Sequence, residues 1–248
     1  MDISGARVLV VGATGVLGGL IACALAERGA LPALAGRNPV RLAALARDLG
    51  GPPARCFEAC DLDQCSALGP WAERALSGLD GVLVTVGAAA FGAVEDVSNA
   101  MAGHLLTVNA LCPMAVLRGA APLVADKGFL LAMTGGVPER ARTDATVDVP
   151  MPMGQPEHPD QPHPHPHPQT DHIAGTADYT ASKEALSGWL GVLAEELAPR
   201  AVTVLDIRSP HLDTGFTERS LTGQAPALPP GADALKAVHF LMDSIASA

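Results

Sequence analysis

The stretch from Arg7 to Gly19, RVLVVGATGVLGG, constrains the fold of this chain more than any other part of the sequence. Its first five residues form a short apolar run rich in β-branched side chains, which is typical of a strand buried on both faces. A glycine-rich turn follows directly, and an alanine-rich segment up to Gly29 then predicts a helix. This order predicts an anion site, because glycines let the backbone approach a phosphate and the N–H groups of a helix N-terminus favour negative charge.

The residues of the predicted anion site come from the turn and from the beginning of the helix. Their spacing is GxxGxxG, whereas the common dinucleotide fingerprint is GxGxxG. Such a turn can also serve packing alone, but the strand before it and the helix after it favour the binding of a pyrophosphate. The expected contacts are Gly12, Thr14, Gly15, Val16, Leu17 and Gly18.

Strands and helices alternate along most of the chain. Further strands are expected at 31–35, 54–59, 81–87, 128–134 and 202–207, and further helices at 40–49, 64–76, 97–124, 177–198 and 233–245. Parallel strands joined by helical crossovers form a doubly wound sheet with helices on both faces. The sequence therefore predicts an α/β protein with a Rossmann-type sheet of about six strands, in a single domain over residues 1–248.

The composition argues against several kinds of binding partner. The chain has 248 residues and a formal net charge of −10 with no basic stripe, which argues against nucleic acid as a partner. The first apolar run is far shorter than a membrane span and no basic region precedes it, so we expect a cytoplasmic protein that does not bind membranes. The five cysteines contain no CxxC pair, and we expect buried or half-buried thiols there, with no metal.

Residues 137–176 interrupt the alternation of strands and helices. The segment has no periodic apolar pattern and holds a Pro/His tract between Met151 and Pro168, where proline excludes both helix and central strand. We therefore expect a flexible insertion. Its histidines invite a metal hypothesis, but alternating His and Pro spread successive imidazoles around the chain, so we expect no metal site.

Tyr179 and Lys183 lie one helical turn apart at the start of the helix that follows the insertion, and therefore share a face. A phenol with a pKa of about 10 is a poor acid–base group at neutral pH, and a nearby ammonium lowers that pKa. Taken with the glycine turn, Asp61 and Asn109, the Tyr-x-x-x-Lys element resembles the short-chain dehydrogenase/reductases, over residues 5–216.

The resemblance implies a role for each matching residue. Tyr179 would exchange a proton with a carbonyl or alcohol oxygen, Lys183 would hold the ribose of a nicotinamide cofactor, and Asn109 would anchor a water in the proton relay. The family also implies a small carbonyl or alcohol substrate and a homodimer or homotetramer. The remaining cofactor contacts that it implies are Asp61, Leu62 and Gly87 at the adenine, and Pro210 and Thr214 at the carboxamide.

The choice of cofactor depends on the residues after the second strand. A carboxylate there would bind the ribose hydroxyls of NAD, whereas this chain has Gly36-Arg37-Asn38. Arg37 can bind a 2′-phosphate through charge-assisted hydrogen bonds, unless it is merely solvated at the strand end. We therefore expect NADP rather than NAD, with Arg37 and Asn38 among its contacts.

One departure from the family concerns the catalytic serine after the fifth strand. Gly135 stands at that position, and Thr134 offers the only adjacent hydroxyl to orient a substrate. The loss of one positioned donor typically lowers the rate by about 10²–10³-fold.

The sequence leaves three hypotheses for the function. The first is an NADP-dependent oxidoreductase that uses Tyr179, Lys183, Asn109 and Thr134, and the second is a nucleotide-binding protein with weak or no catalysis. The third, ranked last because the expected substrate domain is missing, is an enzyme of nucleotide sugars.

Overall fold

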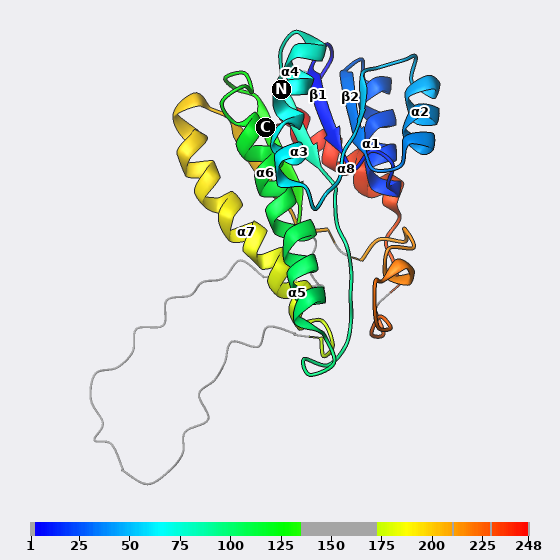
Figure 1. Cartoon of the computed structure of the whole chain (residues 1–248). Coiled ribbons are helices and arrows are strands. Elements are labelled where there is room, and N and C mark those ends of the chain that lie inside the picture. The colour runs from blue at the N-terminus through cyan, green and yellow to red at the C-terminus, as the bar shows by residue number, and fades with distance from the viewer. Residues whose placement is uncertain (1–2, 135–172, 210, 229, 248) are drawn as a thin grey trace, which may run out of the picture.

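The computed structural model describes residues 3–134, 173–209, 211–228 and 230–247, and its centre is a sheet of six parallel strands (Figure 1). The strand order β3-β2-β1-β4-β5-β6 is the doubly wound α/β arrangement that the sequence predicts. The order reverses between β1 and β4, so the connections that leave these strands diverge and open a crevice at their carboxyl ends. The strands are β1 (Arg7–Val11), β2 (Leu31–Gly36), β3 (Ala54–Cys56), β4 (Gly81–Val84), β5 (Phe129–Met133) and β6 (Thr203–Ile207).

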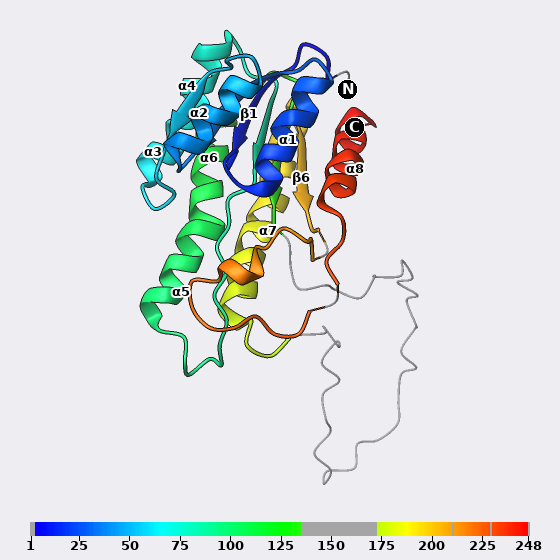
Figure 2. The same cartoon turned by 90° about the vertical axis from the view of Figure 1, so that its right-hand side faces the viewer.

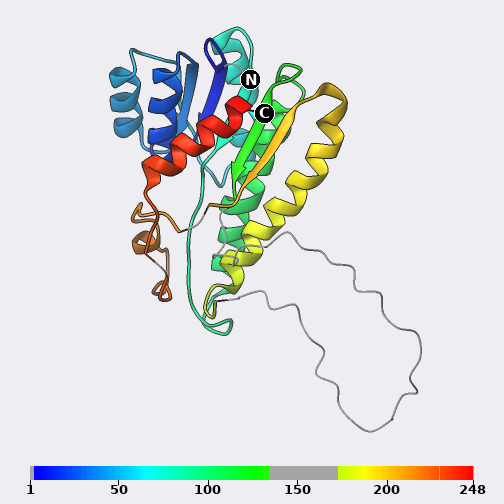
Figure 3. The same cartoon turned by 180° about the vertical axis from the view of Figure 1, so that it is seen from behind.

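Helices cover both faces of the sheet, as Figures 2 and 3 show from two further sides. One face carries α1 (Val16–Glu27), α2 (Pro39–Asp48) and α8 (Ala234–Ser247). The other face carries α3 (Leu62–Ser66), α4 (Leu68–Leu76), α6 (Cys112–Ala120) and α7 (Ala177–Leu197). A further helix, α5 (Asn99–Leu106), runs through a π-helical turn, η1 (Thr107–Leu111), into α6.

Strand β1 shows how alternate side chains fill the two cores. Val8 and Val10 belong to the cluster that packs under α1 and α8, whereas Leu9 and Val11 belong to the cluster under α4, α6 and α7. All four side chains are fully buried. Successive side chains of a strand point to opposite faces, so a parallel sheet between two helical layers needs an unbroken apolar run. The run from Arg7 to Val11 meets this requirement, as predicted.

Two helices that the sequence pattern predicts as continuous are interrupted. The helix expected at 64–76 is α3 and α4, which meet at Ala67. The helix expected at 97–124 begins after Ser98, whose hydroxyl accepts a hydrogen bond from the N–H of Met101 (3.2 Å), and it ends at Ala120. Its π-helical turn is also unpredicted, and such turns occur most often at functional sites. The strand expected at 54–59 is shorter than predicted, Ala54–Cys56.

All five cysteines are free thiols, as predicted, but their burial differs from the prediction. Cys65 and Cys112 are buried with their sulfur atoms 3.5 Å apart, where α3 packs on α6, and Cys23 is half-buried. Cys56 and Cys60 are exposed, because β3 is an edge strand and the chain after it runs over the surface. The expectation of buried thiols is therefore wrong for these two.

The segment from Asn99 to Ala120 is long and apolar enough to cross a membrane by length and composition alone, but half of it is buried within the fold. Val116, Leu117 and Ala120 of α6 belong to the core cluster that also holds residues of α4 and α7. A helix packed on several sides needs the same apolar composition. Burial in the core therefore accounts for this segment.

The packing of α6 on α3 gives a stability prediction. A Cβ on Gly119 would lie 2.1 Å from the carbonyl oxygen of Ser66, so Gly119→Ala should lower the free energy of unfolding by about 1–3 kcal/mol, the usual range for overpacking. Gly103 on α5 is the matched control, since a Cβ there meets nothing within 4 Å, and Gly103→Ala should stabilise by up to about 1 kcal/mol. Denaturant unfolding measures both changes. Equal effects of the two substitutions would contradict the packing argument.

Candidate active site

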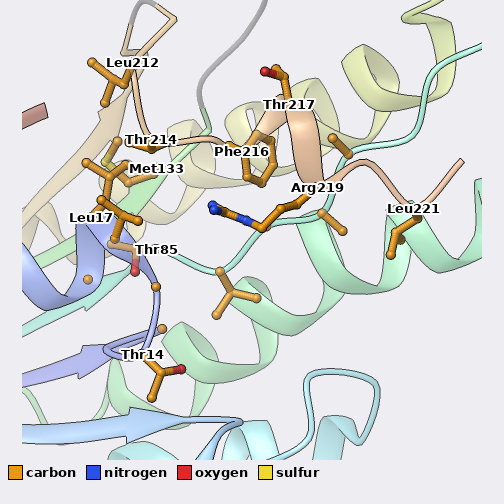
Figure 4. Close-up of a pocket in the computed structure, with 18 of the residues that line it drawn as sticks. Thr14, Leu17, Thr85, Met133, Leu212, Thr214, Phe216, Thr217, Arg219 and Leu221 are labelled. Atoms are coloured by element: carbon orange, nitrogen blue, oxygen red, sulfur yellow. The ribbon is translucent and has the colours of Figure 1, made fainter. Parts of the chain in front are cut away.

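A cavity of about 940 Å³ opens at the carboxyl ends of β1 and β4 (Figure 4). Its walls come from the turn after β1, the residues after β2 and β4, the start of α7 and the segment between β6 and α8. The roles assigned to the site residues remain predictions, but the structure brings most of these residues to this one cavity. Those that line it are Gly12, Thr14, Gly15, Val16, Leu17, Gly18, Arg37, Asn38, Gly87, Thr134, Tyr179, Lys183 and Thr214.

The glycine turn brings β1, α1 and the chain after β4 into close contact. Gly12 has a φ of +96°, and a Cβ on it would lie 2.5 Å from the hydroxyl oxygen of Thr85. A Cβ on Gly18 would lie 2.2 Å from the carbonyl oxygen of Gly12. Gly15 is the N-cap of α1 and has no side chain in front of the first helical N–H groups. The glycines therefore serve packing and also leave the helix N-terminus open to the cavity.

Tyr179 and Lys183 project from the first turns of α7 into the cavity. The Tyr179 ring lies between two aromatic rings, with centroid distances of 6.0 Å to Phe91 and 6.3 Å to Phe216. The Nζ of Lys183 lies 6.0 Å from the centroid of the Tyr179 ring and donates a hydrogen bond to the carbonyl oxygen of Met133 (3.3 Å). The tyrosine and the lysine thus share one face of α7, as their spacing predicts.

Burial controls the protonation of both groups. It raises the pKa of Tyr179 to about 12, so the prediction that Lys183 lowers this pKa is wrong for this arrangement. Burial also lowers the pKa of Lys183 to about 8, against the attraction of the Asp206 carboxylate, which raises it. The cost of moving each charge out of water exceeds the attraction between the two groups at this distance. The phenol therefore keeps its proton at neutral pH.

Asn109 lies in the π-helical turn and is fully buried. Its Oδ1 accepts from the N–H of Ala88 (2.8 Å), and its Nδ2 donates to the carbonyl oxygen of Ala88 (2.9 Å) and to the hydroxyl of Ser182 (2.9 Å). Ser182 in turn donates to the carbonyl oxygen of Tyr179 (2.7 Å). Asn109 therefore ties the chain after β4 to the first turn of α7. The sequence interpretation missed Ser182, although it lies three residues after Tyr179 on the same helix face.

Thr134 is buried at the end of β5, and its hydroxyl donates to a carboxylate oxygen of Asp206 on β6. The other oxygen of Asp206 accepts from the hydroxyl of Ser187 (2.5 Å) and from Nε of Arg208 (3.2 Å). The donor proton of Thr134 is thus already used, and its predicted role toward a substrate gains no support from this arrangement. The sequence interpretation missed Asp206, for which the signal was a single carboxylate within the otherwise apolar strand Thr203–Ile207.

Arg37 and Asn38 follow β2 at the far end of the cavity, where Thr14 packs against Gly36. Asn38 is the N-cap of α2 and accepts a hydrogen bond from the N–H of Arg41 (3.0 Å). Arg37 and Arg41 are exposed and line the cavity, so this end carries two guanidinium groups. The sequence interpretation did not include Arg41, which lies four residues after Arg37 and faces the same cavity.

The structure does not bring every predicted contact to the cavity. Asp61 and Leu62 do not line it, because the Asp61 carboxylate caps α3 by accepting from the N–H (3.0 Å) and the side-chain amide (2.8 Å) of Gln64. Phe57 and Glu58 line the cavity in their place. The predicted contact Pro210 lies outside the described residues, as does most of the predicted insertion 137–176.

Comparison with protein families agrees with this geometry. The family model described as enoyl-(acyl carrier protein) reductase matches residues 12–147, which is more than half of the chain. The chain belongs to the short-chain dehydrogenase/reductase family. The resemblance to this family is therefore confirmed, and the protein is an oxidoreductase of a family that uses NAD(P).

Individual relatives of this short-chain dehydrogenase/reductase cover nearly all of it. The chain is 26% identical to nodulation protein G of Rhizobium meliloti (strain 1021) over 220 residues, 88% of this chain and 78% of the relative. Its fold is similar to that of a short chain dehydrogenase from Burkholderia cenocepacia J2315 in complex with NADP, with a TM-score of 0.75, 22% identity and coverage of 99% and 92% of the two chains. A short-chain dehydrogenase/reductase from Serratia marcescens BCRC 10948 gives a TM-score of 0.74 at 20% identity, with coverage of 97% and 90%.

The buried lysine of this short-chain dehydrogenase/reductase predicts a pH dependence of stability. The pKa of Lys183 is about 8 in the folded protein, below the ordinary 10.5, so the folded state binds fewer protons than the unfolded state between these values. From pH 8 upward, the free energy of unfolding of the wild type should therefore rise relative to that of Lys183→Met. The gain should reach up to about 3 kcal/mol, at about 1.4 kcal/mol per pKa unit. Denaturant titrations between pH 7 and 10.5 measure it.

Lys236→Met controls for the loss of a lysine, because Lys236 is exposed on α8. A difference between the wild type and Lys183→Met that stays constant over this pH range would contradict the prediction.

Proposed function

We propose that this protein is an NADP-dependent oxidoreductase that interconverts a small carbonyl compound and its alcohol. The observation that carries the proposal is the placement of the Tyr179 phenol and the Lys183 amine in the same cavity as the glycine turn Gly12–Gly18. The lining of the cavity fits a dinucleotide. The turn around Gly12 and Gly18 has no room for a Cβ, and the guanidinium groups of Arg37 and Arg41 line the cavity where the chain leaves β2. When bound, the nicotinamide supplies or accepts the hydride.

The chain's own residues suit the proton-transfer half of a reduction. The Tyr179 phenol lines the cavity and is protonated at neutral pH, so it has a proton to donate to a carbonyl oxygen bound beside it. The rings of Phe91 and Phe216 flank the half-buried ring of Tyr179, which lines the cavity. Lys183 lies beside the phenol and also lines the cavity. Asn109 accepts a hydrogen bond from the N–H of Ala88, another residue of the cavity lining.

Arg37 supports NADP as the cofactor. Its guanidinium lies after β2, where a 2′-phosphate would need a cation, and Glu58 is the one carboxylate among the described residues that line the cavity. The similar structure from Burkholderia cenocepacia was solved with NADP. A charge-assisted hydrogen bond to such a phosphate is worth about 1.5–3 kcal/mol.

A second candidate function is nucleotide binding with weak or no catalysis, in a structural or sensing role. The observation that favours it is the hydrogen bond from Thr134 to Asp206, which leaves no described hydroxyl of this strand end to orient a substrate. Under this hypothesis the cofactor would bind with ordinary affinity, while Tyr179 would have no measurable role.

We also propose a cytoplasmic homodimer or homotetramer of one-domain subunits. Leu106 and Leu111, on α5 and η1, and Val192, on α7, are large apolar side chains left exposed on neighbouring helices. Exposed apolar side chains of this kind support an interface between copies of the chain.

The tyrosine decides between the two candidate functions. Tyr179→Phe should lower kcat for NADPH-dependent carbonyl reduction by about 10²–10⁴-fold, the usual contribution of a general acid, and leave the Kd for NADPH within about twofold. Consumption of NADPH with a panel of ketones and quinones measures the first quantity, and fluorescence titration measures the second. Unchanged turnover in the variant would remove Tyr179 from the mechanism, and a wild type that binds NADPH but reduces none of the panel would favour the second candidate.

The cofactor preference has its own test. Arg37→Gln should weaken NADPH binding about tenfold or more and leave NADH binding nearly unchanged, because only NADPH carries the 2′-phosphate. Arg47→Gln removes the same charge from the exposed far end of α2 and is the matched control. A wild type that binds NADH as tightly as NADPH would contradict the proposed preference.

A further inference from the structure

The segment between β6 and α8 covers one side of the cavity, and we call residues 211–223 the cover loop. It is attached to the chain that follows β4 by backbone hydrogen bonds from the N–H of Leu221 to Ala89 (2.7 Å) and from the N–H of Phe91 to Thr222 (3.0 Å). Near its centre lies a short 3-10 helix, η3 (Thr217–Arg219). Residues of the cover loop and of the glycine turn line the same cavity.

Arg219 ends η3, and its guanidinium points into the cavity toward the side where Leu17 and Thr214 lie (Figure 4). The side chain passes close to Gly215, where a Cβ would lie 3.3 Å from Nη1 of Arg219. Gly215 also has a φ of +62°, a conformation that glycine adopts without strain. The Arg219 side chain thus extends past the backbone of Gly215 toward the first turn of α1.

No residue in the described part of the chain accepts a hydrogen bond from the Arg219 guanidinium or forms an ion pair with it. The neighbouring carboxylate, Glu218, instead accepts from the hydroxyl of Thr217 (3.3 Å). The described lining of the cavity is cationic, although the whole chain has a formal net charge of −10. The charged side chains that line it are the basic Arg37, Arg41, Lys183 and Arg219 and the acidic Glu58.

We propose that Arg219 binds the diphosphate of the dinucleotide from the cover-loop side, opposite the N-terminus of α1. The inference rests on the proposed function, since it needs a dinucleotide in this cavity. A planar guanidinium offers parallel N–H donors that match two phosphate oxygens, and the helix N-terminus offers backbone N–H groups to the same anion. Arg37 lies after β2 at the other end of the cavity. Arg37 therefore discriminates between dinucleotides, whereas Arg219 binds the part that NADPH and NADH share.

The two arginines can be separated by experiment. Titration of the full chain with NADPH and with NADH gives two Kd values for each variant. Arg219→Gln should raise both about tenfold and leave their ratio unchanged, whereas Arg37→Gln should change the ratio. Arg219→Lys, which keeps the charge but loses the planar fork, should lie between the wild type and Arg219→Gln. Arg74→Gln, at an exposed site on α4 away from the cavity, is the matched control and should bind as the wild type does.

Each outcome decides the assignment. If Arg219→Gln binds both dinucleotides within twofold of the wild type, Arg219 does not contact the diphosphate, while the proposed function stands. If its only effect is on kcat/KM for carbonyl substrates, with both Kd values unchanged, the arginine serves the substrate and the assignment is overturned. If the wild type binds neither dinucleotide, the proposed function fails, and the inference fails with it.

Discussion

The cavity depends on the close approach of α1 to the end of β1. A Cβ on Gly18 would lie 2.2 Å from the carbonyl oxygen of Gly12, so any side chain there would push the helix away from the strand. Thr85 completes the contact, because its hydroxyl donates to the carbonyl oxygen of Val11 (3.0 Å) and occupies the space beside Gly12. The turn after β1 and the chain after β4 are thus joined where the strand order reverses. The residues after β2, the start of α7 and the segment between β6 and α8 line the rest of the cavity around this contact.

Where Tyr179 and Lys183 line the cavity, the cost of desolvation opposes the attraction between their charges. Lys183 is 6% exposed and donates to a backbone carbonyl, so its positive charge is held in a place from which water is largely removed. The Tyr179 phenol lies between two aromatic rings, and a negative charge there would be poorly solvated. Desolvation penalises both charged forms and outweighs their mutual attraction. The phenol therefore keeps its proton at neutral pH, and its raised pKa makes it a weaker acid than an exposed tyrosine.

Sequence reasoning reached the fold because the signals for it are local. The apolar run Arg7–Val11 and the alternation of strands and helices leave few parallel topologies, and the observed order is the usual one. Sequence reasoning failed where the environment of a side chain depends on tertiary contacts. Helix spacing shows that Tyr179 and Lys183 share a face, but it cannot show how much water reaches them. Two other misses had a local signal, because Pro70 follows the break at Ala67 and Pro113 follows the π-helical turn Thr107–Leu111, and a proline within a helix removes a backbone donor.

Asp206 illustrates why the site could be predicted only in part. It lies opposite Ala132 in the sheet register, far along the chain from the strand end where Thr134 offers its hydroxyl. Once the sheet forms, the carboxylate needs donors, and the hydroxyls of Thr134 and Ser187 supply them. A hydroxyl that satisfies a partly buried carboxylate cannot also donate to a substrate oxygen. The sequence thus shows that Thr134 stands beside the position of the missing serine, but only the fold shows that its hydroxyl donates to Asp206.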